Sequence, residues 1–69
     1  MKKYSVVFDK DGVQFSLCTH AKNKAVAHNK AVRRARQMTK DKTITANDIK
    51  ATIYEGFYLG RRFIQIFQD

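Results

Sequence analysis

Residues 4–18, YSVVFDKDGVQFSLC, contain two alternating apolar segments joined by a turn sequence, and this pattern constrains the fold more than any other. A repeat of two residues places side chains on one face of a β-strand. The alternating residues are Tyr4, Val6 and Phe8 in the first segment and Val13, Phe15 and Leu17 in the second. Asp11-Gly12 supplies the positive φ angles that a tight hairpin turn needs. The segment is therefore predicted to form a β-hairpin.

From about Ala21 to Thr39 the spacing of apolar residues becomes helical. On a helical wheel one broad arc contains Ala21, Ala25, His28, Ala31, Val32, Ala35 and Met38. The opposite arc contains Lys22, Asn29, Lys30, Arg33, Arg36, Gln37 and Lys40, with Arg34 at its edge and Val26 as an exception. Because the apolar arc is mostly alanine, the helix is expected to lie close against a sheet.

The sequence ITANDI, residues 44–49, predicts the start of a second helix. Thr45 can cap the helix and Asp48 can reach back to it, as in a capping box. We expect a helix over Ala46–Glu55 that ends at Gly56, a residue type common just after helices. Its apolar contacts would come from Ile44, Ile49 and Ile53.

The C-terminal sequence RRFIQIFQD, residues 61–69, is interpreted as a strand. Ile64 and Ile66 would lie on one face of this strand, with Phe63 and Phe67 on the other. An alternative continues the second helix through two glycines, which cost about 1 kcal/mol each relative to alanine. The β-branched and aromatic content favours the strand.

Together these segments predict one α+β domain over residues 1–69, with element order β-β-α-α-β. A small antiparallel sheet, made of the N-terminal hairpin and the C-terminal strand, would carry both helices on one face. A chain of this length buries only ~60% of the surface that it exposes when unfolded. It therefore has little room for the enclosed cleft of an enzyme.

The charge of the chain is strongly basic and concentrated in one region. Fourteen Lys and Arg residues face six Asp and Glu residues, which gives a net charge of +8. The predicted helix over residues 21–39 contains basic residues but no acid with which they could pair. Excess positive charge of this kind favours nucleic acid or an acidic protein as a partner.

We therefore predict a non-catalytic protein that contacts the phosphates of DNA or RNA through one helix face. The candidate contact residues are Lys22, Lys30, Arg33, Arg34, Arg36, Lys40, Arg61 and Arg62. Arg61 and Arg62 adjoin several aromatic residues that could stack on bases, form part of the core or form a homodimer contact. Phosphate contacts alone carry little sequence preference.

Catalytic, metal and cofactor sites have little support in the sequence. The carboxylates are scattered, and no nucleophile or phosphate-loop motif is present. His28 is expected to be a core or boundary histidine rather than a metal ligand. Cys18 is the only cysteine, so no internal disulfide is possible, and we expect a small strand residue there.

Two other functions stay open from the sequence. The basic face could dock on an acidic protein surface, as in a small inhibitor or adaptor of the kind that phages and mobile elements encode. Alternatively, the chain could be a structural homodimer.

A membrane-surface helix is disfavoured because alanine buries too little area. The chain has no spanning apolar segment, and the N-terminal apolar run is too short for a signal peptide. A cytoplasmic location is therefore expected.

Overall fold

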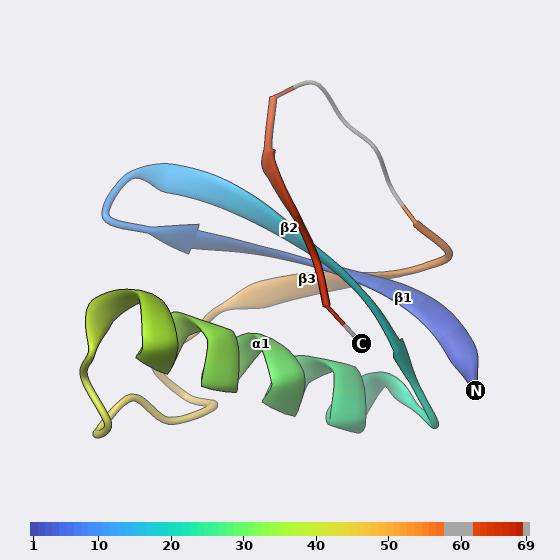
Figure 1. Ribbon diagram of the computed structural model, residues 1–69, viewed down its shortest axis with the longest axis horizontal. Helices are drawn as coiled ribbons and strands as arrows, with labels where there is room; N and C mark the ends of the chain where they lie inside the picture. Colours follow the sequence, from blue (N-terminus) through green and yellow to red (C-terminus); the bar gives the residue numbers. More distant parts are fainter. Residues whose placement is uncertain (58–61, 69) are drawn as a thin grey trace.

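The computed structural model describes residues 1–57 and 62–68, which form a four-stranded sheet with one helix on one face (Figure 1). The elements are β1 Lys2–Lys10, β2 Val13–Ala21, α1 Lys24–Thr39, β3 Ala51–Glu55 and β4 Ile64–Phe67. The strand order is β3-β1-β2-β4. The α+β class agrees with the sequence prediction, but the predicted order β-β-α-α-β and the purely antiparallel sheet are wrong.

The predicted hairpin is confirmed and forms the centre of the sheet. β1 and β2 pair antiparallel over their whole length, with Phe8 opposite Phe15. The turn between them has positive φ angles at Asp11 (54°) and Gly12 (80°). The Gly12 amide also donates a hydrogen bond to Oδ1 of Asp9 at 3.0 Å. Two consecutive positive φ angles match the twist of a hairpin.

The first predicted helix is confirmed, but it begins three residues later than Ala21. Ala21 pairs with Lys2 as the last residue of β2. Asn23 then caps α1, because its side-chain oxygen accepts a hydrogen bond from the Val26 amide at 3.0 Å. The predicted apolar arc needs a correction: Ala25 is exposed, whereas Val26 packs against the core.

The second predicted helix, over Ala46–Glu55, is wrong. Its start forms only a single turn, in which the Thr45 amide donates to the Asp48 carboxylate at 2.7 Å and the Asp48 amide donates to the Thr45 carbonyl at 3.0 Å. The chain then enters β3, which pairs antiparallel with β1. The sequence ATIYE is rich in β-branched and aromatic residues, and a helix of about ten residues is marginal without strong packing.

The C-terminal strand is confirmed as a strand, but its direction differs from the prediction. β4 pairs parallel with β2, so the sheet is mixed. β3 ends with Glu55 opposite Tyr4, at the sheet end away from the hairpin turn. β4 begins opposite Phe15, nearer the hairpin turn, and runs in the same direction as β3.

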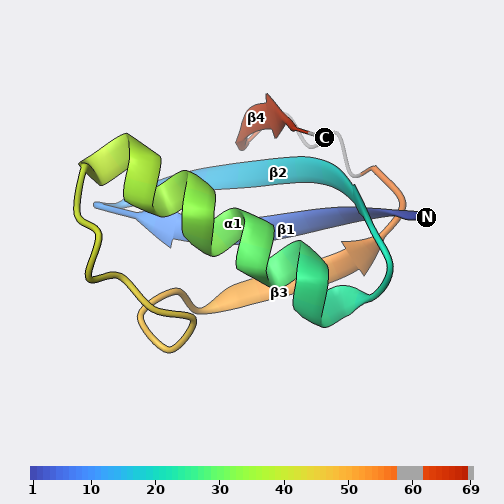
Figure 2. The same ribbon diagram turned by 60° about the horizontal axis from the view of Figure 1, so that its bottom comes forward.

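The core lies between α1 and the sheet face that the hairpin pattern predicts. Tyr4, Val6, Phe8 and Leu17 are buried there against the fully buried Ala27, Ala31 and Ala35 of α1. Figure 2 shows α1 crossing this face obliquely, in front of β2, β1 and β3. The small side chains on α1 permit this close approach, as expected from the alanine-rich arc.

Among residues 1–57 and 62–68, no helix covers the opposite face of the sheet, but this face still buries small residues. Ser5, Ser16 and Cys18 are almost inaccessible on this face. The ring of Phe57 packs edge-on against His20 and Phe67, with centroid distances of 5.4 and 6.1 Å. In the described part of the chain, no helix combines the length and apolar character needed to cross a bilayer.

Candidate nucleic-acid interface

Four of the predicted contact residues come together on the C-terminal half of α1. Arg33 and Lys40 are exposed, whereas Arg34 and Arg36 are half-buried at its two flanks. Lys40 follows the last helical residue in a left-handed conformation, with φ 58°. Cations near a helix C-terminus are stabilised by the helix dipole. We call Arg33, Arg34, Arg36, Lys40 and the neighbouring Lys42 the basic surface.

Arg36 and Lys42 form a hollow that the sequence did not predict. Arg36 Nε donates a hydrogen bond to the Ile44 carbonyl, which fixes the guanidinium against the loop before β3. Arg36 also lines a hollow of about 350 Å³ together with Gln37, Lys40 and Lys42. The described residues that line this hollow include three cations and no carboxylate. The sequence does not predict Lys42 as a contact residue, because Lys42 lies after the end of the helical pattern. It nevertheless belongs to the same run of basic residues.

The cations of the basic surface have no acidic partner among the described residues, where the one ion pair joins Lys10 to Asp11 at 3.0 Å. Asp41 is the nearest acid in sequence, between Lys40 and Lys42. Its carboxylate accepts hydrogen bonds from the Thr43 hydroxyl at 2.6 Å and the Thr43 amide at 2.9 Å. These two bonds, the hydroxyl first, hold the pKa of Asp41 below its usual range. Asp41 therefore stays ionised but is engaged locally.

Three further predicted contact residues do not join the basic surface. Lys30 donates from Nζ to the His20 carbonyl at 2.6 Å, which ties α1 to the end of β2. Lys22 precedes the N-cap of α1, and the helix is roughly 24 Å long, so Lys22 and Lys40 lie at opposite ends. Arg62 is exposed just before β4, the edge strand next to β2, and α1 makes no contact with β4. The remaining candidate, Arg61, lies outside the described residues.

The aromatic residues that could stack on bases lie away from the basic surface. Phe67 is 62% exposed and pairs with Cys18, so it faces the side of the sheet opposite α1. Lys3 Nζ lies 5.3 Å from the centre of the Phe57 ring on the same side. A phosphate chain on the outer face of α1 would not reach these rings.

The histidine and cysteine side chains have structural positions. His28 is half-buried, and its Nε2 lies 3.2 Å from the Ile49 carbonyl oxygen, which agrees with the predicted boundary histidine. Cys18 is a buried residue of β2, as predicted, with Sγ 3.8 Å from the Ser5 hydroxyl. Within residues 1–57 and 62–68, no group of three or more His, Cys, Asp or Glu side chains is placed to hold a metal ion.

Comparison of the chain with protein-family models, curated proteins and solved structures gives no match.

Proposed function

We propose that this protein binds DNA or RNA without catalysis, through phosphate contacts made by the basic surface. The observation that carries the proposal is a helix whose cations have no acidic partner among the described residues. A cation that is not paired within the protein can neutralise a phosphate and release its counterions. Arginine adds a planar donor group that can bind phosphate in a bidentate manner.

The hollow lined by Arg36, Lys40 and Lys42 supports a phosphate contact at the C-terminal end of α1. The bond from Arg36 Nε to Ile44 orients the guanidinium and leaves its terminal nitrogens for another acceptor. Lys40 and Lys42 are exposed and can approach the same anion.

We further propose a cytoplasmic location, since a single buried thiol suits a reducing compartment.

The proposal predicts binding with a strong dependence on salt. For four phosphate contacts, affinity should fall roughly 100-fold between ~50 mM and ~200 mM salt. Fluorescence anisotropy with a labelled duplex and a labelled single strand of random sequence measures this directly. Absence of binding to both probes at ~50 mM salt would contradict the proposal.

A charge-reversed pair tests whether the basic surface is the contact. The double variant Arg33→Glu/Lys42→Glu should weaken binding at least tenfold at about 100 mM salt, where charges more than ~10 Å away are screened. The control Lys2→Glu/Arg62→Glu changes the net charge equally at exposed positions off this surface. It should weaken binding no more than threefold. Equal losses of nucleic-acid affinity in the two double variants would show that binding depends only on the total charge of the protein.

Docking on an acidic protein is the second candidate function. It is favoured by the apolar side chains that remain exposed beside α1, because nucleic-acid phosphates make no use of such a surface. Capture of a protein partner by a chain that binds neither nucleic-acid probe at ~50 mM salt would favour this second candidate.

A further inference from the structure

One strip of the sheet face that carries α1 remains uncovered. α1 lies over β1, β2 and β3 and does not reach β4 (Figure 2). Ile64 and Ile66 of β4 pair with Phe15 and Leu17, so they face the helix side of the sheet. Ile64 is nevertheless 52% exposed. We define the apolar strip as the exposed Val13, Met38 and Ile64 together with the half-buried Phe15 and Ile66.

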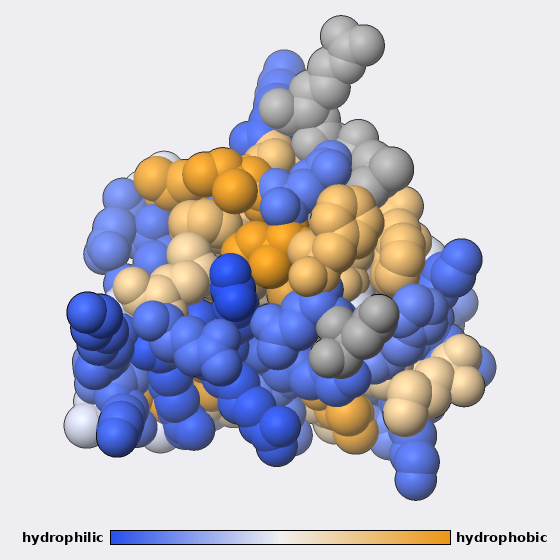
Figure 3. Space-filling view, in the orientation of Figure 1, coloured by the Kyte–Doolittle hydropathy of each residue, from blue (hydrophilic) through white to orange (hydrophobic). Residues whose placement is uncertain are grey.

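The apolar strip has the dimensions of a missing second helix. Four strands spaced about 4.8 Å apart form a sheet about 19 Å wide, counting half a spacing outside each edge strand. One helix with its side chains is about 10 Å wide, and α1 lies toward β3. Figure 3 shows apolar side chains gathered above the polar band that follows α1. The strip therefore leaves room for one more helix beside α1.

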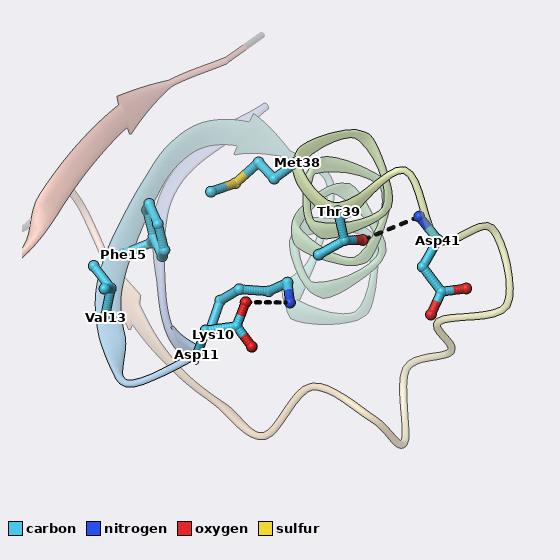
Figure 4. A pocket seen from close by; sticks show the side chains of 7 residues that line it. All are labelled: Lys10, Asp11, Val13, Phe15, Met38, Thr39 and Asp41. Carbon is cyan, nitrogen blue, oxygen red and sulfur yellow. Dashed lines mark hydrogen bonds and ion pairs between the residues drawn. The ribbon is translucent and has the colours of Figure 1, made fainter.

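Positive charge borders the strip along α1. Lys30, Arg34 and Met38 follow one another at intervals of four, so they lie in a row on one flank of the helix. Lys30 contacts the end of β2 through the His20 carbonyl. At the other end of this row, Met38 lines a pocket of about 560 Å³ together with Phe15 (Figure 4). Arg34 therefore lies over β2 between these two contacts.

Arg34 has an unused donor at this position. Its Nε is inaccessible to solvent and has no hydrogen-bond partner among the described residues. Its Nη1 makes only a long contact of 3.5 Å with Gln37. No described carboxylate pairs with Arg34, so an incoming carboxylate that bonds to its guanidinium would bring a gain that an uncharged apolar ligand would not.

We propose that the apolar strip binds an acidic amphipathic α-helix of a partner protein. Apolar side chains of that helix, spaced three and four residues apart, would cover Phe15, Ile64 and Ile66. Carboxylates on its adjoining flank would pair with Lys30 and Arg34. A second copy of this chain is a poor occupant, because two molecules of charge +8 would bring like charges together.

The charges at the hairpin end set the orientation of the partner. Asp11 and Asp41 line the pocket at that end, and Asp11 is paired with Lys10 (Figure 4). The acidic residues of the bound helix must therefore lie toward Lys30 and Arg34, away from the turn. Arg34 belongs to the basic surface and also borders the strip, but the exposed Arg33 and Lys42 lie outside the strip, so the two kinds of binding can be tested separately.

A peptide titration followed by NMR tests the inference. The probe is an 18-residue peptide with a leucine stripe at helical spacing and glutamates on one flank, added to the ¹⁵N-labelled full chain. Amide signals of Val13, Phe15, Arg34, Met38, Ile64 and Ile66 should shift together. A peptide with lysine in place of each glutamate should bind at least tenfold more weakly. Equal affinity for both peptides, or shifts confined to other residues, would overturn the inference.

Two apolar-to-polar variants provide the matched comparison. Ile64→Ser should lower the affinity for the glutamate peptide at least fivefold. If this variant does not fold, Met38→Ser should show the same loss of affinity. Tyr54→Ser removes a similarly exposed apolar side chain from β3, on the other face of the sheet, and should leave affinity unchanged. An oligonucleotide that shifts the amides of the strip would assign it to nucleic acid. Concentration-dependent self-association through those amides would assign it to a second copy, and either result would replace the proposal.

Discussion

The basic residues of this protein differ in how their charged groups are used. Lys30 and Arg36 each donate to a backbone carbonyl of a neighbouring segment, at His20 and Ile44 respectively. Arg33 and Lys40 extend into solvent. The anchored residues hold α1 to β2 and to the loop before β3. Some of the basic residues therefore hold elements together, whereas others leave their charged groups exposed to solvent.

Gly12 is the residue on which the hairpin turn depends most. Its φ of 80° is strained for any residue with a Cβ, although no neighbouring atom would obstruct one. Gly12→Ala should therefore destabilise the protein by about 1–2 kcal/mol. Asp11→Asn, at the adjacent positive φ, should change stability by less than about 0.5 kcal/mol because asparagine tolerates this conformation. Chemical denaturation measures both, and equal stability of Gly12→Ala and the unmodified chain would contradict the turn geometry.

Asp41 should show an unusually low pKa in a pH titration. Hydrogen bonds from Thr43 favour its ionised form in the folded chain, so the pKa lies below the ordinary value of 3.8. Its contribution to stability is complete above the ordinary value and is lost as the pH falls through the lower, folded pKa. NMR titration of the Asp41 side chain measures this value. Thr43→Val should return the pKa toward 3.8, and an unchanged value in that variant would refute the role of Thr43.

At the scale of elements, α1 is matched to the sheet by alanine. Ala27, Ala31 and Ala35 recur at intervals of four and are fully buried. Replacing one of them by a larger residue would force the helix away from β1 and β2. The close contact therefore depends on side-chain size more than on helix propensity.

A pair of alanine-to-leucine variants tests this packing. Ala31→Leu should destabilise the protein by about 1–3 kcal/mol through overpacking. Ala25→Leu places the same side chain on the exposed side of α1 and should change stability by less than about 0.5 kcal/mol. Thermal unfolding followed by circular dichroism distinguishes them, since 1 kcal/mol corresponds to about 4–8 °C in a domain of this size. Similar melting temperatures for the two variants would exclude tight packing at Ala31.

Elements with strong local signals could be predicted from the sequence. The hairpin follows from strict alternation and Asp11-Gly12, and α1 follows from its helical spacing. The segment 46–55 could not be predicted correctly, because a capping sequence at Thr45 and Asp48 competed with β-branched residues in ATIYE. The edge of β1 decides the outcome, since pairing with it satisfies the backbone of β3 and packs Ile53 against the core.

At the scale of the whole molecule, the sequence predicted the basic character of α1 but not the grouping of its cations. Helical spacing places Arg33, Arg34 and Arg36 on the C-terminal half of α1, with Arg34 and Arg36 on its two flanks, and Lys40 follows the last helical residue. Lys42 joins them only through the path of the loop, which depends on the Arg36–Ile44 contact. Arg62 separates from them because β4 lies beyond β2. Such positions depend on strand order, which no local pattern specifies.

The central position of the hairpin has a consequence for how the chain reaches its native state. Its two strands are neighbours in sequence, so their pairing closes a minimal loop and costs little chain entropy. β4 must instead join Ile64 to Phe15 across most of the chain, and only four residues hold it in register. We expect β4 to assemble last and to detach first. Since Cys18 pairs with the final residue of β4, we expect detachment of this edge strand to increase the exposure of the buried thiol.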